Sequence, residues 1–178
     1  KLAHTVRVVS NRTKNTLLKL GVKEEKIIKL SVETNTKNFT HAQKNTALIP
    51  GYDPSALYIL TVARFVHQKN LSLLIQAFSR ITAEFPKAKL LIVGTGSLES
   101  SLKKIALNMP IQFLPWSNDV PDLMATADIY ALSSNYEGWG RVLIEAEAAG
   151  VPIITTDVGC VGEVIQKSIA TEIIKTND

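Results

Sequence analysis

The chain has 178 residues, of which 46% are hydrophobic and 20% are charged. This composition predicts a folded chain that can bury a core, and it excludes an intrinsically disordered one. The formal net charge is +4 and the sequence pI is about 9.2. Lysine and arginine residues are spread along the chain without interleaved aromatic residues, so we expect no nucleic-acid groove.

The mild basicity fits an anionic small ligand or an attraction to anionic lipid, besides an ordinary solvated surface. The single cysteine, Cys160, excludes an internal disulfide and a Cys-rich metal site, and it suits a reducing compartment. No apolar run reaches the roughly 20 residues that cross a bilayer, and the sequence shows no signal peptide. Since the chain begins at Lys1 and not at a methionine, a further N-terminal segment could precede it.

Residues 1–30 are expected to form a strand, a helix and a second strand. The strands are HTVRVVS and KIIKL, and the helix between them is NRTKNTLLKLG, with Ser10 as its N-cap and Gly21 at its end. Residues 31–56 are polar and rich in turn-forming residues. This segment is predicted to be a linker or a long surface connection.

From Leu57 onward, short apolar runs alternate with segments of helical spacing. The runs are LYILTVA, KLLIVG, IQFL, DIYAL, PIITT and IATEII, and the segments between them are NLSLLIQAFSRITAEF, SLESSLKKIALN, DVPDLMATA, GRVLIEAEAAG and VGEVIQK. Strands without polar alternation are buried on both faces, and their alternation with helices predicts right-handed crossovers onto a parallel sheet. We therefore expect a doubly wound α/β domain with a parallel sheet of about six strands, and ligands bound outside the carboxyl ends of the strands.

The loop ARFVHQKN follows the first of these strands and places Arg64 and Lys69 just before a helix. Two cations beside a helix N-terminus can form an anion site, because the free N–H groups and the helix dipole add to their charge. Two solvent-facing cations are the alternative. His67 lies between them and is interpreted as an exposed loop residue.

The next two strand-end loops carry weaker signals. GTGS has Gly94 and Gly96 where a dinucleotide fingerprint would begin, but Glu99 stands at the third glycine position. A tight strand-to-helix turn explains these glycines better than a dinucleotide site does. In LPWSNDV, Trp116 lies at the edge of the sheet, where its ring either borders a nucleobase or packs at the rim.

The loop SSNYEGWGR has the most informative pattern. Gly138 and Gly140 let the backbone approach a ligand closely, and the amides of residues 140–142 would begin a helix that faces a bound phosphate. Glu145 would lie about 7 Å further along the helix axis, which is about the offset from a diphosphate to a ribose. Glu137 would lie on the other side of the phosphates. The alternative is a helix N-terminal acid with an unrelated surface glutamate.

Together, ARFVHQKN, LLIVGTGS, ADIYALSSNYEGWGRVLIEAEAAGVPIITTDVG and the following GEV resemble the donor-binding C-terminal domain of retaining glycosyltransferases of family 4, which have the GT-B fold. The resemblance runs from about Leu57 to Ile165. An E-x7-E spacing with an internal Gly-x-Gly, an EA-x-x-x-G-x-P tail and an upstream R-x4-K form a specific combination, far more specific than any one of them.

The resemblance implies a role for each matching residue. Arg64 and Lys69 would neutralise the donor diphosphate, and Glu137 would contact the hydroxyls of the transferred sugar. Because this family retains anomeric configuration by front-face attack and has no settled nucleophile, Glu137 would be catalytic through positioning and electrostatic stabilisation. The other implied contacts are Gly138, Trp139 and Gly140 beside the sugar, the amides of Arg141 and Val142 at the phosphates, Glu145 at the ribose, and Trp116 and Ser117 at the base.

Some positions depart from the family pattern. LSVETN stands where many members have IPNGVD at the hinge, so hinge contacts are not carried over. Cys160 stands where a second glycine is usual, and we interpret it as a small buried substitute and not as a nucleophile. The glycine-containing loop usual after the GEV helix and the terminal helices are missing. We expect a remnant of the acceptor domain at 1–30, a linker or hinge at 31–56, and the donor-binding domain at 57–178.

The expected function is the donor-binding part of a retaining glycosyltransferase, which transfers a hexose-type sugar from a nucleotide diphosphate sugar to a polysaccharide, lipopolysaccharide or glycolipid. The chain has no D-x-D motif, so we expect no metal and no other cofactor. The acceptor would bind through the missing N-terminal domain, so the isolated chain should bind donor without transferring sugar. The resemblance implies a cytoplasmic protein, with peripheral association of the full-length chain at the membrane face.

Three other functions were compared with this one. A nucleotide-sugar 2-epimerase of the same fold would need acidic and histidine residues from both domains, and E-x7-E with R-x4-K speaks against it. An NAD-dependent dehydrogenase needs the third fingerprint glycine and an acid about 20 residues further on, and Glu99 at that glycine position argues against it. A non-catalytic nucleotide-sugar-binding fragment is an alternative that describes the chain by itself.

Overall fold

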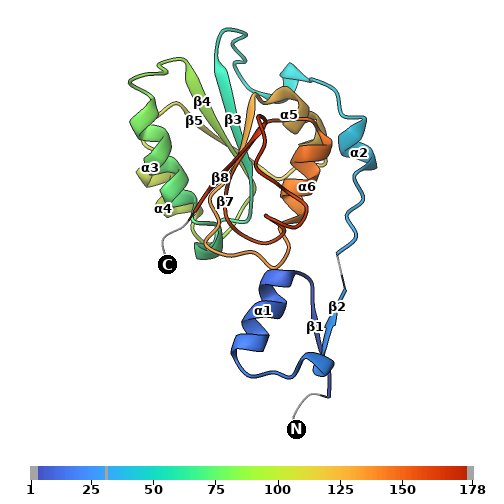
Figure 1. The fold of residues 1–178 in the computed structure, drawn as a ribbon. Coiled ribbons are helices and arrows are strands. Elements are labelled where there is room, and N and C mark those ends of the chain that lie inside the picture. The colour runs from blue at the N-terminus through green and yellow to red at the C-terminus, as the bar shows by residue number, and fades with distance from the viewer. Residues whose placement is uncertain (1–3, 31, 176–178) are drawn as a thin grey trace.

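A computed structural model describes residues 4–30 and 32–175 and is built around a six-stranded sheet (Figure 1). The strands are β3 (Leu57–Val62), β4 (Ala88–Val93), β5 (Ile111–Leu114), β6 (Ile129–Leu132), β7 (Ile153–Thr156) and β8 (Thr171–Ile174). Their order is β5-β4-β3-β6-β7-β8, and every pairing is parallel. The predicted doubly wound α/β fold is confirmed.

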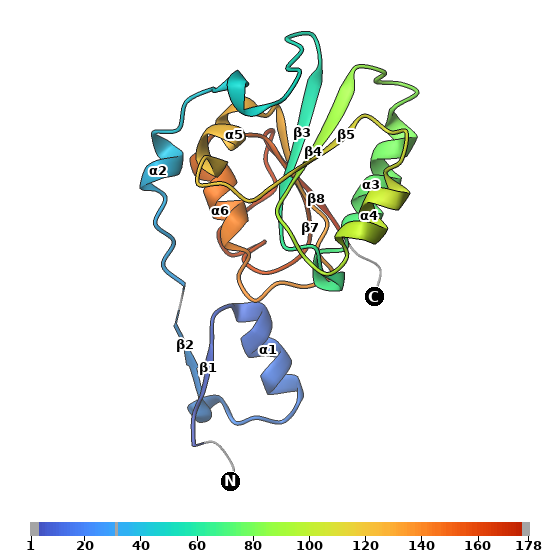
Figure 2. The same ribbon diagram turned by 180° about the vertical axis from the view of Figure 1, so that it is seen from behind.

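Helices cover both faces of this sheet (Figures 1 and 2). α3 (Leu71–Ile81) and α4 (Glu99–Ile105) lie on one face, and α5 (Val120–Thr126) and α6 (Arg141–Ala148) lie on the other. Each pair of helices buries its apolar stripe in a separate core. The central strands β3 and β4 lie between the two cores, which explains why they lack polar alternation.

The strand order reverses direction between β3 and β6. From β3 the chain continues to β4 and β5 on one side, and it then returns to β6, β7 and β8 on the other side. In open parallel sheets this switch point leaves a crevice at the carboxyl ends of the two strands. Here the crevice lies between the loops that follow Val62 and Leu132.

The N-terminal residues form a small unit at the carboxyl end of the large sheet (Figure 1). β1 (Val6–Val8) and β2 (Ile27–Lys29) pair in parallel, with α1 (Asn11–Lys19) and a 3₁₀ turn (Glu24–Lys26) between them. The Ser10 hydroxyl accepts a hydrogen bond from the Thr13 amide at 3.1 Å, which confirms the predicted N-cap. Gly21 has φ +82° just after the helix, as a terminating glycine should.

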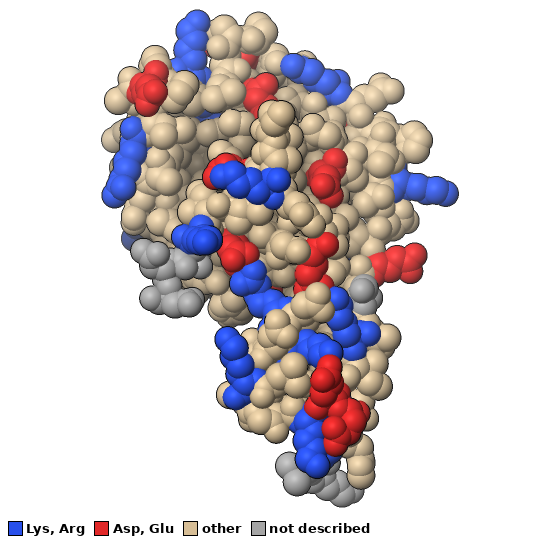
Figure 3. Space-filling model, in the orientation of Figure 1, with Lys and Arg blue, Asp and Glu red and all other residues tan. Residues whose placement is uncertain are grey.

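A carboxylate from the large domain holds this unit in place. Glu163 accepts hydrogen bonds from the Asn11 amide, at the start of α1, and from Lys29 Nζ at 2.7 Å. Arg12 forms an ion pair with Asp157. Figure 3 shows basic and acidic side chains gathered at this junction.

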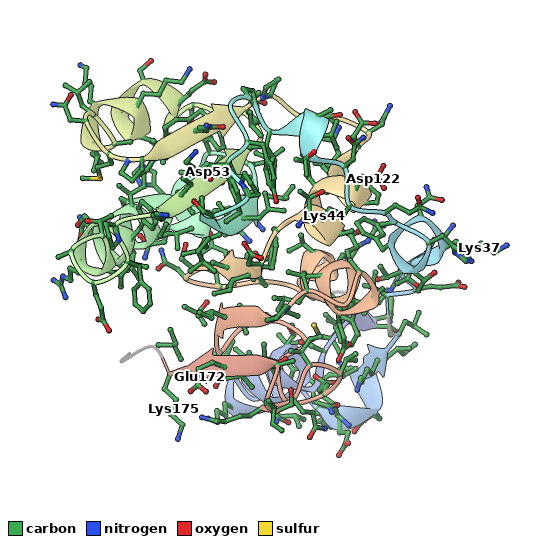
Figure 4. The ribbon with its side chains drawn as sticks, turned by 90° about the horizontal axis from the view of Figure 1, so that it is seen from above. Lys37, Lys44, Asp53, Asp122, Glu172 and Lys175 are labelled. Carbon is green, nitrogen blue, oxygen red and sulfur yellow. The ribbon has the colours of Figure 1, made fainter. Side chains whose placement is uncertain are left out.

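Residues 32–56 run alongside α5 and α6, and they include α2 (Lys37–Thr40) and a 3₁₀ turn (Thr46–Leu48). The Gln43 amide donates to Asp122 Oδ1 at 3.0 Å, and the Asn45 amide donates to Thr126 Oγ1 at 2.8 Å. In Figure 4, Lys37 points from α2 into solvent. The segment is thus fastened to α5 by hydrogen bonds from its backbone amides, while Lys37 stays outside.

The segment VGEVIQK, predicted as a short helix, is a turn. The amides of Glu163 and Val164 both donate to the Cys160 carbonyl, and the Gly162 amide donates to the Ile165 carbonyl. Gly162 has φ +83°, a left-handed conformation that interrupts a helix. In this turn the carboxylate of Glu163 contacts the first amide of α1.

Candidate functional site

A cleft of about 890 Å³ lies at the switch point between β3 and β6. Its walls come from the loops after β3, β4, β5 and β6, from the first turns of α6, and from Val9, Val32, Asn38 and Phe39 of the N-terminal unit and the connecting segment. The predicted site residues that line it are Arg64, Lys69, Trp116, Ser117, Glu137, Trp139, Gly140, Arg141, Val142 and Glu145. Gly138 does not line it.

Lys69 and Glu137 form an ion pair inside the cleft, although they come from different strand-end loops. Their side chains are only 15% and 8% exposed. Ser134 Oγ donates a hydrogen bond to the same carboxylate oxygen, Oε1, at 2.7 Å. A buried charge is stable only when it is paired and hydrogen-bonded, and both conditions are met here.

The two loops that carry this pair are tied together by side-chain and backbone hydrogen bonds. Ser133 Oγ donates to the carbonyls of Lys69 and Asn70 at 3.0 and 3.1 Å. Asn70 Nδ2 donates to Asn135 Oδ1 at 2.8 Å, and the Asn135 amide donates to the Gln68 carbonyl at 2.9 Å. Asn70 is held at φ 45°, a left-handed conformation that asparagine tolerates better than most residues. These bonds fix the site before any ligand arrives.

The N-terminus of α6 opens into the cleft. Gly140 is its N-cap at φ 80°, and no side chain caps the first amides. Gly140, Arg141 and Val142 all line the cleft, so free N–H groups and the positive end of the helix dipole lie at the site. The residues of α3 do not line the cleft. The helix N-terminus that lines the cleft together with Lys69 and Arg64 is therefore that of α6, although α3 begins just after Lys69 in sequence.

A turn packs closely behind this N-terminus. The Cys160 amide donates to the Trp139 carbonyl at 2.7 Å, and a Cβ on Gly159 would lie 2.4 Å from that same oxygen. Cys160 is fully buried, and burial raises its pKa to about 11. The thiol is therefore protonated at neutral pH, which agrees with its interpretation as a small buried substitute.

Glu145 lies further along α6 from its N-terminus and also lines the cleft. Its side chain is 19% exposed, and burial raises its pKa, while the Arg141 guanidinium 3.9 Å away acts in the opposite direction. A carboxylate kept partly desolvated beside a cleft, with one distant cation, has acceptor capacity left for a ligand.

The predicted base-contacting residues lie at the mouth of the cleft. Trp116 is 64% exposed and belongs to neither of the two hydrophobic cores. Ser117 is already engaged, because its hydroxyl donates to Asp119 Oδ2 at 2.6 Å and accepts from the Asp119 amide at 3.0 Å. Arg64 and His67 are exposed, and Arg64 lines the cleft.

Gly94 and Gly96 serve packing, as the sequence suggested. A Cβ on Gly94 would lie 2.0 Å from the Ala63 carbonyl oxygen, and one on Gly96 would lie 2.5 Å from the Phe65 carbonyl oxygen. The loop after β4 can therefore approach the loop after β3 only because both residues are glycine. This close approach brings Thr95 to the cleft wall.

Sequence reasoning missed two parts of the site. Ser133 and Ser134 directly follow a buried strand, and polar residues at that position could have been predicted to lie near the site. Asn38 and Phe39 gave no signal, because their place depends on how the connecting segment folds back along α5 and α6.

A parallel sheet with a cleft that holds charged side chains and a free helix N-terminus at its switch point is the arrangement of nucleotide-binding α/β domains. Residues 44–178 match the family described as Glycosyl transferases group 1. The match covers more than half of the chain, and the chain belongs to this family.

Individual relatives agree with this family. The N-acetyl-alpha-D-glucosaminyl L-malate synthase of Bacillus anthracis is 37% identical over 120 residues, which are 65% of this chain and 31% of that protein. The gpi3 subunit of the phosphatidylinositol N-acetylglucosaminyltransferase of Schizosaccharomyces pombe is 35% identical over 115 residues, or 61% and 25% of the two chains. The chain thus spans about a third or less of the length of these relatives.

Solved structures show the same fold at low identity. TarM aligns with a TM-score of 0.80 at 19% identity, over 97% of this chain and 33% of that chain. HepE of Anabaena, solved in complex with UDP and glucose, aligns with a TM-score of 0.78 at 19% identity, over 98% and 50%. The GT-B type of fold and the glycosyltransferase family are therefore confirmed. These comparisons give the epimerase alternative no support.

Proposed function

We propose that the chain is the donor-binding part of a retaining glycosyltransferase, which transfers a hexose-type sugar from a nucleotide diphosphate sugar to a polysaccharide, lipopolysaccharide or glycolipid. One observation carries the proposal: a single cleft holds Lys69, the free N-terminus of α6 and, on either side of that terminus, Glu137 and Glu145. The relative from Schizosaccharomyces pombe, a subunit of a phosphatidylinositol N-acetylglucosaminyltransferase, supports a glycolipid acceptor.

The diphosphate is placed at the N-terminus of α6. The amides of Arg141 and Val142 would donate to its oxygens, and Lys69 and Arg64 would add positive charge from the facing loop. Lys69 would then exchange its ion pair with Glu137 for one with phosphate. These groups give the diphosphate its counter-charge without a metal, so we infer that binding needs no divalent cation.

The rest of the donor follows from this placement. The ribose would lie over Glu145, with the base toward Trp116 and Ser117 at the mouth of the cleft. The sugar would lie at Glu137, beside the backbone of Trp139 and Gly140. Gly138 does not line the cleft in this structure, so its part would be confined to shaping the turn between Glu137 and the helix.

In transfer, the bond from the anomeric carbon to the diphosphate would break first, with the electron pair leaving on the phosphate oxygen. The acceptor hydroxyl would attack from the same face and give up its proton to that oxygen, so configuration is retained. Glu137 would position the sugar and stabilise its positive charge, and the free amides of α6 would stabilise the leaving diphosphate.

We place the acceptor in an N-terminal domain of which residues 1–30 are a part, with 31–56 as the hinge and 57–178 as the donor-binding domain. On this proposal the chain alone binds donor but does not transfer sugar, because closure of the cleft between two domains positions the acceptor. We infer a cytoplasmic protein that, at full length, lies at the membrane face. No helix within 4–30 and 32–175 has the length and apolar character needed to cross a membrane.

Calorimetry of the chain with UDP-glucose, UDP-N-acetylglucosamine, GDP-mannose, UDP, GDP and UMP tests the proposal. We expect at least one nucleotide sugar and its nucleoside diphosphate to bind, the monophosphate to bind at least tenfold more weakly, and EDTA to change nothing. Arg64→Ala should weaken diphosphate binding about tenfold, whereas Arg80→Ala, an exposed arginine on α3, should not. Binding of none of these ligands, or binding that EDTA abolishes, would contradict the proposal.

A further inference from the structure

Ser134 lies behind the cleft, and its hydroxyl contacts the carboxylate of Glu137. It is fully buried at the end of β6, and its Oγ donates to Glu137 Oε1 at 2.7 Å. Its own backbone is fixed as well, because Thr156 Oγ1 on β7 donates to the Ser134 carbonyl at 2.7 Å. The hydroxyl is therefore attached to the sheet and not to a mobile loop.

Both contacts of Glu137 fall on the same oxygen. Lys69 Nζ and Ser134 Oγ each meet Oε1, and neither uses Oε2. Two donors on one oxygen fix the plane of the carboxylate and leave the other oxygen for a third partner. The carboxylate lines the cleft but is only 8% exposed, so little of it is open to solvent.

The two donors differ in what a ligand does to them. Lys69 carries charge that a diphosphate attracts, so it can leave Glu137 when donor binds. Ser134 is neutral and is held by the sheet, so it stays. Without it, the contact with Lys69 alone would orient the carboxylate, and a diphosphate removes that contact. The orientation of the carboxylate matters only for a ligand that carries the sugar.

We propose that Ser134 is a positioning residue, which holds Oε1 of Glu137 after Lys69 has turned to the diphosphate and so presents Oε2 to the hydroxyls of the sugar. The inference rests on the proposed function of the cleft. It predicts that Ser134 matters for the sugar and not for the nucleoside diphosphate.

The neighbouring Ser133 provides a matched control. It is also buried, and its hydroxyl donates to the Lys69 and Asn70 carbonyls, not to Glu137. Losing it would loosen the loop that carries Lys69, which contacts the diphosphate shared by both ligands. Ser133→Ala should therefore weaken both ligands alike, whereas Ser134→Ala should weaken the nucleotide sugar alone.

The measurement is the ratio of the Kd for UDP to the Kd for UDP-N-acetylglucosamine, with GDP and GDP-mannose as a second pair. Ser134→Ala should lower this ratio by about tenfold or more and leave the Kd for the nucleoside diphosphate within about twofold, as expected for one hydrogen bond to a charged group. Ser133→Ala should leave the ratio unchanged. Because both ligands are measured on one preparation, the ratio does not depend on the folded fraction.

Two further variants guard against a purely structural effect. Ser134→Cys keeps the approximate size but donates weakly, so its ratio should lie between those of Ser134→Ala and the wild type. In a Glu137→Ala background, Ser134→Ala should lower the ratio no further, since the two residues act as a unit. An additive double variant, or an equal loss of both ligands in Ser134→Ala, would overturn the inference.

The outcomes separate this inference from the proposed function. If the wild type binds both ligands and Glu137→Ala lowers the ratio but Ser134→Ala does not, the inference fails and the proposed function stands. If the wild type binds neither pair of ligands, the proposed function fails and the inference fails with it.

Discussion

The burial of Glu145 lowers the stability of the folded protein at neutral pH. It is mostly buried on α6, and its cation is the exposed Arg141 at 3.9 Å, which compensates little. Burial raises its pKa above the ordinary value. The ionised form is therefore less favoured in the folded state than in the unfolded chain.

Glu145→Gln should raise the melting temperature at neutral pH. Since the folded-state pKa lies above the unfolded value, the contribution of Glu145 is most favourable below the unfolded pKa and is lost as pH rises through the folded pKa. The stabilisation by Gln should thus shrink as pH falls toward 4. Thermal unfolding of both proteins between pH 4 and 8 measures this. Glu147→Gln, at an exposed position of the same helix, is the control and should change little. A stabilisation that grows toward low pH would contradict the assignment.

The sequence predicted ten of the 21 residues that line the cleft but few of their contacts. Glu137, Lys69 and Glu145 could be found because the E-x7-E and R-x4-K spacings mark them, the first two in strand-end loops and the third on the helix that follows. The Ser134 hydroxyl could not, because its bond to Glu137 depends on the local turn of residues 134–137. Gly138 was predicted at the ligand and lies off the cleft, since in this turn its neighbours Glu137 and Trp139 face the site.

At the scale of elements, α1 depends on a carboxylate from a distant part of the chain. The first turn of α1 contains no acidic residue, and Glu163 supplies the missing negative charge at its N-terminus while also pairing with Lys29. The hydrogen bonds from Lys29 and from the backbone amides of Asn11 and Arg12 outweigh burial and lower the pKa of Glu163. A carboxylate at a helix N-terminus is stabilising, and more so when partly buried.

Glu163→Gln should therefore loosen the N-terminal unit and leave the large domain intact. Hydrogen exchange measured by mass spectrometry should show protection of residues 4–30 reduced about tenfold, the effect of roughly 1.4 kcal/mol. The strands β3 and β4 should exchange as in the wild type. Glu172→Gln, which removes an exposed ion pair with Lys167, should affect neither region. Uniform loss of protection over the whole chain would show that Glu163 supports the large domain instead.

Element types were easier to predict than the turn that contains Glu163. The buried strands and the helices between them follow from apolar runs and helical spacing, and the structure has them in the predicted order. VGEVIQK has the apolar spacing of a helix, but its course is decided by Gly162 and by hydrogen bonds to the Cys160 carbonyl. Cys160 itself is fixed against Trp139, which is a tertiary contact that no local pattern encodes.

At the scale of the whole molecule, the cleft is a product of the topology. Loops far apart in sequence meet because β3 and β6 are neighbours, and the connecting segment and N-terminal unit add a further wall. Successive strands lie side by side, as short connections favour, except at the return from β5 to β6. The course of residues 32–56 could not be derived in this way, because it rests on single bonds such as those to Asp122 and Thr126.

The central claim is that the ligand lies along one direction, with ribose at Glu145, diphosphate at the N-terminus of α6 and sugar at Glu137. Glu145→Ala should then weaken a nucleoside diphosphate and its nucleotide sugar equally, by about 1.5–3 kcal/mol, because both contain the ribose. Glu137→Ala should leave the diphosphate unchanged or slightly tighter, since Lys69 is released from its ion pair.

Calorimetry of both variants with UDP and UDP-N-acetylglucosamine, or with GDP and GDP-mannose, is the most direct test of this claim. We predict that Glu145→Ala loses affinity for both members of a pair and that Glu137→Ala loses affinity for the nucleotide sugar alone. A Glu137→Ala protein that loses the bare diphosphate as severely as Glu145→Ala would contradict it, because the two carboxylates would then contact the same part of the ligand.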